Sequence, residues 1–178
     1  MEAEGRRTLR LMPGARELAQ WLHAHGVPMA LVTRNSVATV RHFHEHVWPR
    51  ALPPMQPAIS RDDCYAPKPD PQAFTAIAAA WGVPCGPELV MVGDSPRHDV
   101  EFGRAAGART ALLDTHCAGL GMPDWRLPHL PALARELWRS YALGIETGSA
   151  GRCGGIACRG CKPFRTGRRG PHACRSRC

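Results

Sequence analysis

The stretch ELVMVGDSPRHD, residues 88–99, decides the fold class of this chain. Its first part is an apolar run with β-branched residues, which predicts a buried strand that ends in Gly93 and Asp94. Asp99 follows five residues after Asp94, where the sequence predicts the opening of a short helix. A buried strand that ends in carboxylates and leads straight into a helix directs attention to the polar residues after each strand.

The same alternation of strand and helix extends in both directions from this stretch. Apolar runs predict further strands over 28–33, 57–60 and 109–115. Periodicity, capping residues and prolines predict helices over 13–25, from Ser36 to the prolines that begin at Pro49, over 70–81, from Asp99 to about Gly107, and over 131–143. Continuous apolar strands between helices indicate an α/β domain, a Rossmann-like parallel sheet with helices on both faces. Ligands of such sheets bind at the carboxyl ends of the strands.

The net charge of +8 divides the chain into two unlike parts. All 15 acidic residues lie in residues 1–147, where 15 of the 23 basic residues balance them. Residues 148–178 hold the remaining basic residues, five of the eight cysteines and almost no aliphatic side chains. We therefore expect a folded core over 1–147 and a disordered tail over 148–178. The charge of the whole chain then says nothing about what the core binds.

Several classes of protein are excluded at this stage. No apolar run approaches the roughly 18 residues of a membrane helix, and residues 1–14 lack the apolar segment of a signal peptide. The three cysteines of the core, Cys64, Cys85 and Cys117, are scattered, which favours reduced thiols and a cytoplasmic location. Membrane partners are not expected, and the sequence leaves the oligomeric state open.

Four polar residues at the expected strand ends suggest a site for phosphate and magnesium. Thr33 ends the first strand, Lys68 lies between two prolines in APKPDP, and Asp94 and Asp99 follow the strand at 88–95. Mg²⁺ prefers carboxylates and water, and a lysine supplies a point charge for a phosphoryl group. Taken singly, Thr33 could be a strand-end cap, Lys68 a solvated charge and Asp99 a helix N-cap. Asp94 is the hardest to explain structurally, because a carboxylate after a buried strand needs a partner.

These residues resemble three motifs of the haloacid dehalogenase-like hydrolases, many of which are magnesium-dependent phosphatases. LVTRN is similar to the second motif, PKPDPQAF to the third and VGDSPRHD to the fourth, and the resemblance covers roughly residues 10–115. It implies that Thr33 binds the transferring phosphoryl group and that Lys68 neutralises its oxygens. It also implies that Asp94 ligates Mg²⁺ and that Asp99 supports the metal shell.

The resemblance also bears on substrate and on secondary contacts. EFGRAAGA, residues 101–108, followed by an apolar strand is similar to phosphoglycolate-phosphatase-like members of the family. Asn35 and Ser95 are the implied secondary contacts to a small phosphorylated substrate. The identity of that substrate is not readable from the sequence.

The first motif of the family, Asp-x-Asp-x-Thr after a strand, is absent from the chain. This motif supplies the aspartate nucleophile, and Asp62, Asp63 and Asp70 cannot replace it by position. In the family's sheet the strand that carries it lies between the strands ending at Thr33 and Asp94. We therefore expect an interrupted sheet, an N-terminally shortened member of the family and no turnover by this chain.

The tail and the histidines suggest weaker alternatives. Four tail cysteines, Cys158, Cys161, Cys174 and Cys178, have a spacing similar to that of zinc ligands, and a zinc-bound tail could bind nucleic acid. We favour an unstructured tail, because the segment lacks the packed apolar residues of small zinc modules.

His42 and His46 lie four residues apart but lack a third ligand at a useful spacing, so exposed histidines are the preferred interpretation. His98 is equally a substrate contact or a loop residue. Two alternatives to a phosphatase remain, a non-catalytic binding or regulatory protein of the same fold, and a zinc-knuckle nucleic-acid binder.

Overall fold

The computed structural model describes residues 2–114 and 122–146, so the tail, its cysteines and Cys117 lie outside the described residues. The elements in chain order are α1 (Glu2–Thr8), α2 (Ala15–Ala24), β1 (Leu31–Val32), α3 (Val37–His42), the π-helical turn η1 (Phe43–Val47), β2 (Ala58–Ile59), α4 (Gln72–Trp81), β3 (Val90–Gly93), the π-helical turn η2 (Pro96–Val100), α5 (Glu101–Ala105), β4 (Arg109–Leu113), β5 (Trp125–Leu127) and α6 (Leu130–Glu146). Among these residues, no helix is long and apolar enough to cross a membrane.

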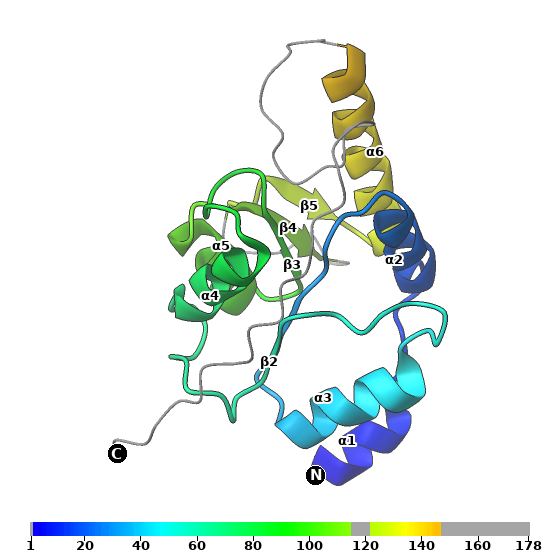
Figure 1. Ribbon diagram of the computed structural model, residues 1–178, viewed down its shortest axis with the longest axis vertical. Helices are drawn as coiled ribbons and strands as arrows, with labels where there is room; N and C mark the ends of the chain where they lie inside the picture. Colours follow the sequence, from blue (N-terminus) through cyan, green and yellow to red (C-terminus); the bar gives the residue numbers. More distant parts are fainter. Residues whose placement is uncertain (1, 115–121, 147–178) are drawn as a thin grey trace.

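The strands form two parallel sheets, which confirms the predicted α/β class. β1 pairs with β2 in one sheet, and β3, β4 and β5 follow one another in the other (Figure 1). Val90 of β3 is in register with Arg109 of β4, and Ala111 of β4 with Trp125 of β5. All pairs run in the same direction, so the carboxyl ends of neighbouring strands meet at one edge of each sheet.

The expected interruption of the sheet is present. Within the described residues, β1 pairs only with β2 and β3 pairs only with β4, so the strands that lead to Thr33 and Asp94 are not neighbours in one ladder. β1 consists of two residues, where the sequence predicted a strand over 28–33. Without a partner on its second side, a strand keeps only half of its ladder hydrogen bonds, which explains the short pairing.

Helix α4 joins the two sheets through a shared core. Its predicted start at Asp70 and Pro71 and its end at Gly82 agree with the observed helix to within two residues, and Gly82 adopts the left-handed conformation that ends many helices. Phe74 and Ile77 of this helix are buried in one cluster with Ile59 of β2 and Phe102 of α5. Apolar residues of both sheets therefore pack against one side of α4.

Helices α2 and α6 cover the other side of the larger sheet. Leu18 of α2 and Leu133 of α6 pack in one buried cluster with Ala111 of β4. The next residue of α2, Ala19, belongs to a third cluster, which also contains Trp48 of the segment that connects the first two strands. Helices thus lie on both faces of the larger sheet, as predicted, and α2 also packs against the segment between β1 and β2.

The structure corrects several expected elements. Helix α1 and strand β5 were not predicted, because seven and three residues are too short to show a clear period. The helix expected to open at Asp99 instead opens at Pro96, with Ser95 as its N-cap. The Ser95 side chain accepts the backbone N–H of His98 at 3.1 Å, so the N-cap reading of Asp99 is wrong.

Candidate functional site

A buried ion pair between Lys68 and Asp99 lies at the centre of the candidate site. The distance from Lys68 Nζ to Asp99 Oδ1 is 2.7 Å, and the side chains are only 11% and 8% exposed. The ammonium also lies 6.0 Å from the centre of the Phe102 ring, which is fully buried. Charges this far from solvent are strongly coupled, so each fixes the position of the other.

The same ammonium connects the two sheets. Lys68 Nζ donates a hydrogen bond of 3.2 Å to the backbone carbonyl of Val32, in β1. Its other partner, Asp99, belongs to η2, which follows β3 of the larger sheet. One lysine therefore bridges the two strand ends that the sequence predicted to lie together.

The second oxygen of Asp99 shapes the loop after β3. Oδ2 accepts the backbone N–H of Asp94 at 3.1 Å and that of Ser95 at 3.0 Å. This close approach requires a glycine at position 93, because a Cβ there would overlap the Asp99 carboxylate. Both oxygens of Asp99 thus accept hydrogen bonds from within the protein, and the side chain holds Lys68 and the loop after β3 in place.

Asp94 has a different environment although it is five residues away. The residue is exposed, and its carboxylate makes no hydrogen bond or ion pair with the described residues. A carboxylate that is presented to solvent beside a buried Lys–Asp pair is a suitable ligand for Mg²⁺, which usually takes one or two carboxylates and completes its shell with water and phosphate. Among the described residues, no three His, Cys, Asp or Glu side chains gather into a metal site, so Asp94 would be the one direct protein ligand of a magnesium ion that takes its other ligands from water and phosphate. Asp99 could contribute only in addition to its existing contacts.

Thr33 and Asn35 form a tight turn after β1. The Thr33 backbone N–H donates to Ile59 O at 2.9 Å, and the Thr33 hydroxyl accepts the backbone N–H of Asn35 at 3.1 Å. The Asn35 carbonyl accepts the N–H of Arg61 at 3.0 Å. These contacts hold the hydroxyl at the carboxyl end of β1, beside the carbonyl that binds Lys68.

His98 connects the two loops of the site. Its Nδ1 lies 3.3 Å from Lys68 O, and its Nε2 lies 3.2 Å from Nη1 of Arg34. A guanidinium can only donate, so Nε2 is the acceptor and the proton sits on Nδ1, facing the carbonyl. The contact to the backbone of Lys68 is a positioning role that neither sequence interpretation of His98 included.

The three aspartates near the third motif have structural partners. Asp62 Oδ2 accepts the Val37 N–H at the start of α3 at 2.8 Å, and Asp63 Oδ2 accepts the N–H and hydroxyl of Ser60, each at 2.7 Å. Asp70 accepts the N–H of Gln72 at 3.0 Å. Each carboxylate caps a helix start or a turn. That none of them replaces the nucleophile stays a prediction.

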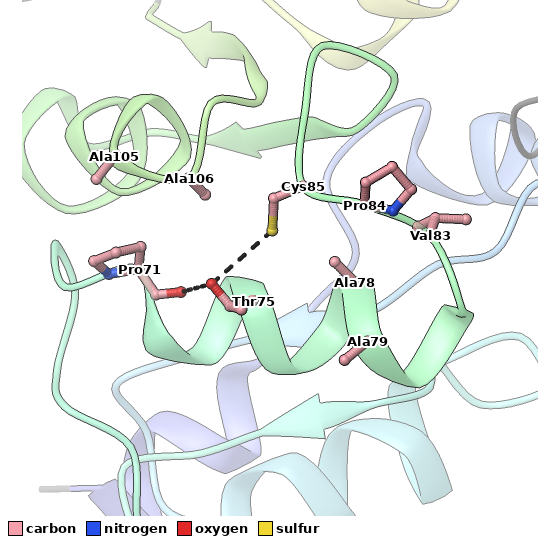
Figure 2. Close-up of a pocket in the computed structure, with 9 residues that line it drawn as sticks. All are labelled: Pro71, Thr75, Ala78, Ala79, Val83, Pro84, Cys85, Ala105 and Ala106. Atoms are coloured by element: carbon pink, nitrogen blue, oxygen red, sulfur yellow. Dashed lines mark hydrogen bonds between the residues drawn. The ribbon is translucent and has the colours of Figure 1, made fainter.

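A cavity between α4 and α5 lies apart from these residues. It has a volume of about 380 Å³ and is lined by small and apolar side chains together with Thr75 and Cys85 (Figure 2). The Cys85 thiol lies 3.9 Å from the Thr75 hydroxyl. None of Thr33, Lys68 and Asp94 lines this cavity, so it is not part of the candidate site.

Two contributors to the site were not predicted from the sequence. The carbonyl of Val32 binds Lys68, and Phe102 forms an apolar wall beside the ammonium. A backbone carbonyl has no sequence signal, and Phe102 looks like any other core residue. Only the tertiary packing identifies them.

Comparisons with known proteins place this geometry in context. The family model of haloacid dehalogenase-like hydrolases matches residues 2–107. A haloacid dehalogenase-like hydrolase domain-containing protein of Arabidopsis thaliana is 36% identical over 152 residues, which are 80% of this chain and 59% of the relative. A phosphoglycolate phosphatase of Pseudomonas fluorescens is 36% identical over 101 residues, which are 57% of this chain and 36% of the relative.

Among solved structures, a HAD phosphatase from Thermococcus onnurineus superposes with a TM-score of 0.65 and 26% identity, covering 76% of this chain and 61% of that one. The chain thus spans between about one third and three fifths of the length of these curated relatives.

Proposed function

The chain belongs to the haloacid dehalogenase-like hydrolases, and from that premise we propose that its site binds the phosphoryl group of a small phosphomonoester beside Mg²⁺. The observation that carries the proposal is the buried contact of Lys68 with Asp99 and with the end of β1. It holds one cation between the turn that contains Thr33 and the loop that contains Asp94. Phosphatase-type relatives support the substrate class.

In this proposal the roles follow from the chemistry of each group. The Thr33 hydroxyl and the neighbouring backbone N–H groups donate to phosphoryl oxygens, and Lys68 supplies a positive charge that does not move when substrate binds. Asp94 holds Mg²⁺, which neutralises negative charge on the phosphoryl oxygens when it is bound. Asp99 positions Lys68 and the loop, and Asn35 and Ser95 form the secondary contacts.

We further propose that this chain binds phosphomonoesters without turning them over. Attack on phosphorus in this family requires an aspartate in Asp-x-Asp-x-Thr, and the chain does not contain that motif. Asp62, Asp63 and Asp70 cap local turns or a helix start through backbone N–H groups, which supports structural roles for them in this proposal. This absence favours a binding or regulatory role of the chain alone as the second candidate function.

The direct test is hydrolysis of para-nitrophenyl phosphate and phosphoglycolate with and without Mg²⁺. We expect no release of phosphate above buffer by the 178-residue chain. Joining the strand segment that carries Asp-x-Asp-x-Thr from a phosphatase relative to its N-terminus should restore magnesium-dependent release. The matched control replaces the first aspartate of the added segment by asparagine and should be inactive.

Two results would contradict the proposal. Magnesium-dependent hydrolysis by the chain alone would show that another group acts as nucleophile. Failure of the extended chain, when it folds and binds phosphoglycolate, would show that the residues of this site do not support the reaction. Calorimetric titration with phosphoglycolate measures binding independently of turnover. In this measurement the Thr33→Val variant should bind about tenfold more weakly than the unchanged chain.

A further inference from the structure

A second cavity lies away from the candidate site, between the N-terminal helices. Its volume is about 510 Å³, and it is bounded by the end of α1, the segment that leads to α2, and the end of the α3–η1 helix. Its lining comprises three arginines, two histidines and three aliphatic residues: Arg7, Arg10, Arg16, His42, His46, Leu9, Leu11 and Val47. None of the residues proposed to bind the phosphomonoester is among them.

Among the described residues, the lining carries positive charge without an acidic residue. The three arginines are permanently charged at any physiological pH. Two lining side chains have an acidic partner that is not itself part of the lining: Glu4 is 3.6 Å from Arg7, and Glu45 is 3.8 Å from His46. The side chains of both pairs are more than half exposed, so these pairs compensate little of the charge.

Part of this lining is already held in place. Arg10 Nη1 donates to the carbonyls of Arg7 and Leu9 at 3.1 and 2.8 Å, which fixes the guanidinium at the end of α1. The rings of His42 and His46 lie with their centres 4.7 Å apart. Arg16 makes no hydrogen bond or ion pair within the described part of the chain, so its five donors face no protein acceptor there.

From these features we propose that the cavity binds a small anion bearing two or more phosphate groups. Guanidinium groups bind phosphate through paired hydrogen bonds, and three of them from different segments match a polyanion better than a single charge. The aliphatic lining residues Leu9, Leu11 and Val47 offer apolar surface to a non-phosphate part of the same ligand. The cavity is open to solvent, and its volume has room for such a ligand.

The probe for the test is inorganic pyrophosphate, titrated by calorimetry into the full chain in magnesium-free buffer. The Arg7→Ala/Arg16→Ala double variant should bind at least about tenfold more weakly than the unchanged chain. The control is the Arg135→Ala/Arg139→Ala double variant in α6, which loses the same two positive charges. It also breaks a matching ion pair, because Arg139 pairs with Glu136 at the same i, i+3 spacing as Arg7 with Glu4. We expect its affinity to change less than about twofold.

Further variants separate this cavity from the candidate site and from loss of folding. Thr33→Val should leave the pyrophosphate affinity of the cavity unchanged. Single replacement of Arg16 by Ala removes no hydrogen bond or ion pair among the described residues, so it should weaken binding with little change in the melting temperature. Three results would each overturn the proposal. These are equal affinities of the two double variants, loss of binding in Thr33→Val alone, and no pyrophosphate binding by the unchanged chain.

Discussion

Asp94 and Asp99 show how two carboxylates of one loop acquire different tasks. Asp99 is buried and receives three donors, from Lys68 Nζ and from the N–H groups of Asp94 and Ser95. Its charge is compensated inside the protein, and a buried carboxylate with fewer donors would be costly. Asp94 lies in solvent and retains its lone pairs for a ligand from outside.

Gly93 is the residue on which this arrangement depends. A methyl group at position 93 would overlap the Asp99 carboxylate, so Gly93→Ala must displace Asp99 or the loop. We expect a loss of about 1–3 kcal/mol in the free energy of unfolding. Urea denaturation followed by circular dichroism measures it. Gly86→Ala is the control, because nothing lies within 4 Å of a Cβ there, and it should change stability by less than about 0.5 kcal/mol.

An equal loss in both glycine variants would mean that contact with Asp99 is not the cause. The Gly93→Ala variant should also bind phosphoglycolate more weakly, since the displaced carboxylate no longer holds Lys68. If the phosphoglycolate affinity of Gly93→Ala were unchanged, the conformation of this loop would not matter for the proposed phosphoryl site.

At the scale of elements, Asp124 attaches β5 to β4. Its Oδ2 accepts the N–H of Thr110 at 2.7 Å and the Thr110 hydroxyl at 2.9 Å, and Thr110 is fully buried in β4. Burial raises the pKa of Asp124, but the hydrogen bonds from Thr110 and from its own backbone, with the charge of Arg104, outweigh burial and hold the pKa below its usual value. The short strand β5 is therefore anchored by an ionised side chain.

This anchor predicts an acid-sensitive contribution to stability. Asp124 takes up its proton at a lower pH in the folded state than in the unfolded state. Its contribution to the free energy of unfolding is therefore complete above the usual aspartate pKa of about 4 and is lost as the pH falls below that value. Urea midpoints of the unchanged chain and of Asp124→Asn should differ at pH 7 and converge towards pH 3.

Thr110→Val provides the matched control for this titration. It keeps the backbone N–H donor and removes the hydroxyl, so its dependence on pH should lie between those of the other two chains. Parallel curves for the unchanged chain and Asp124→Asn across this pH range would contradict the assignment.

At the scale of the whole molecule, the two sheets are held together by side chains rather than by a common ladder. Phe74 of α4 packs edge-on against Phe102 of α5, with ring centres 5.5 Å apart and an angle of 71°. The same cluster contains Ile59 of β2, and Val32 and Met91 pack against it from β1 and β3. Aromatic burial therefore supplies cohesion that backbone hydrogen bonds supply in a continuous sheet.

Phe74→Ala should for this reason destabilise the whole molecule rather than one sheet. Truncating a buried phenylalanine costs about 3–5 kcal/mol, and Phe74 is 6% exposed. Met122→Ala is the control, since Met122 is 81% exposed and its truncation should cost less than about 0.5 kcal/mol. Thermal unfolding monitored by tryptophan fluorescence and by circular dichroism checks both. A loss below about 1 kcal/mol in Phe74→Ala would contradict the role of this cluster.

The sequence predicted features that depend on neighbouring residues better than features that depend on contacts between distant segments. Helix α4 was predicted to within two residues, because Asp70, Pro71 and Gly82 act locally. Strand β1 was predicted too long, since strand length depends on the neighbours with which the strand pairs. The helix start after β3 was assigned to Asp99 rather than to Ser95, because both types of residue cap helices and only their hydrogen bonds distinguish them.

For the candidate site, the order of residues indicated which side chains follow the strands. Resemblance to family motifs grouped Thr33, Lys68, Asp94 and Asp99, and the sequence lacks the motif of the nucleophile. These are properties of residue type and order. The tertiary structure alone decided that Lys68 bridges the two sheets, that Asp99 faces inward and that Asp94 faces solvent. The reason is physical, because burial and the choice among donors arise only when segments that are distant in the chain pack together.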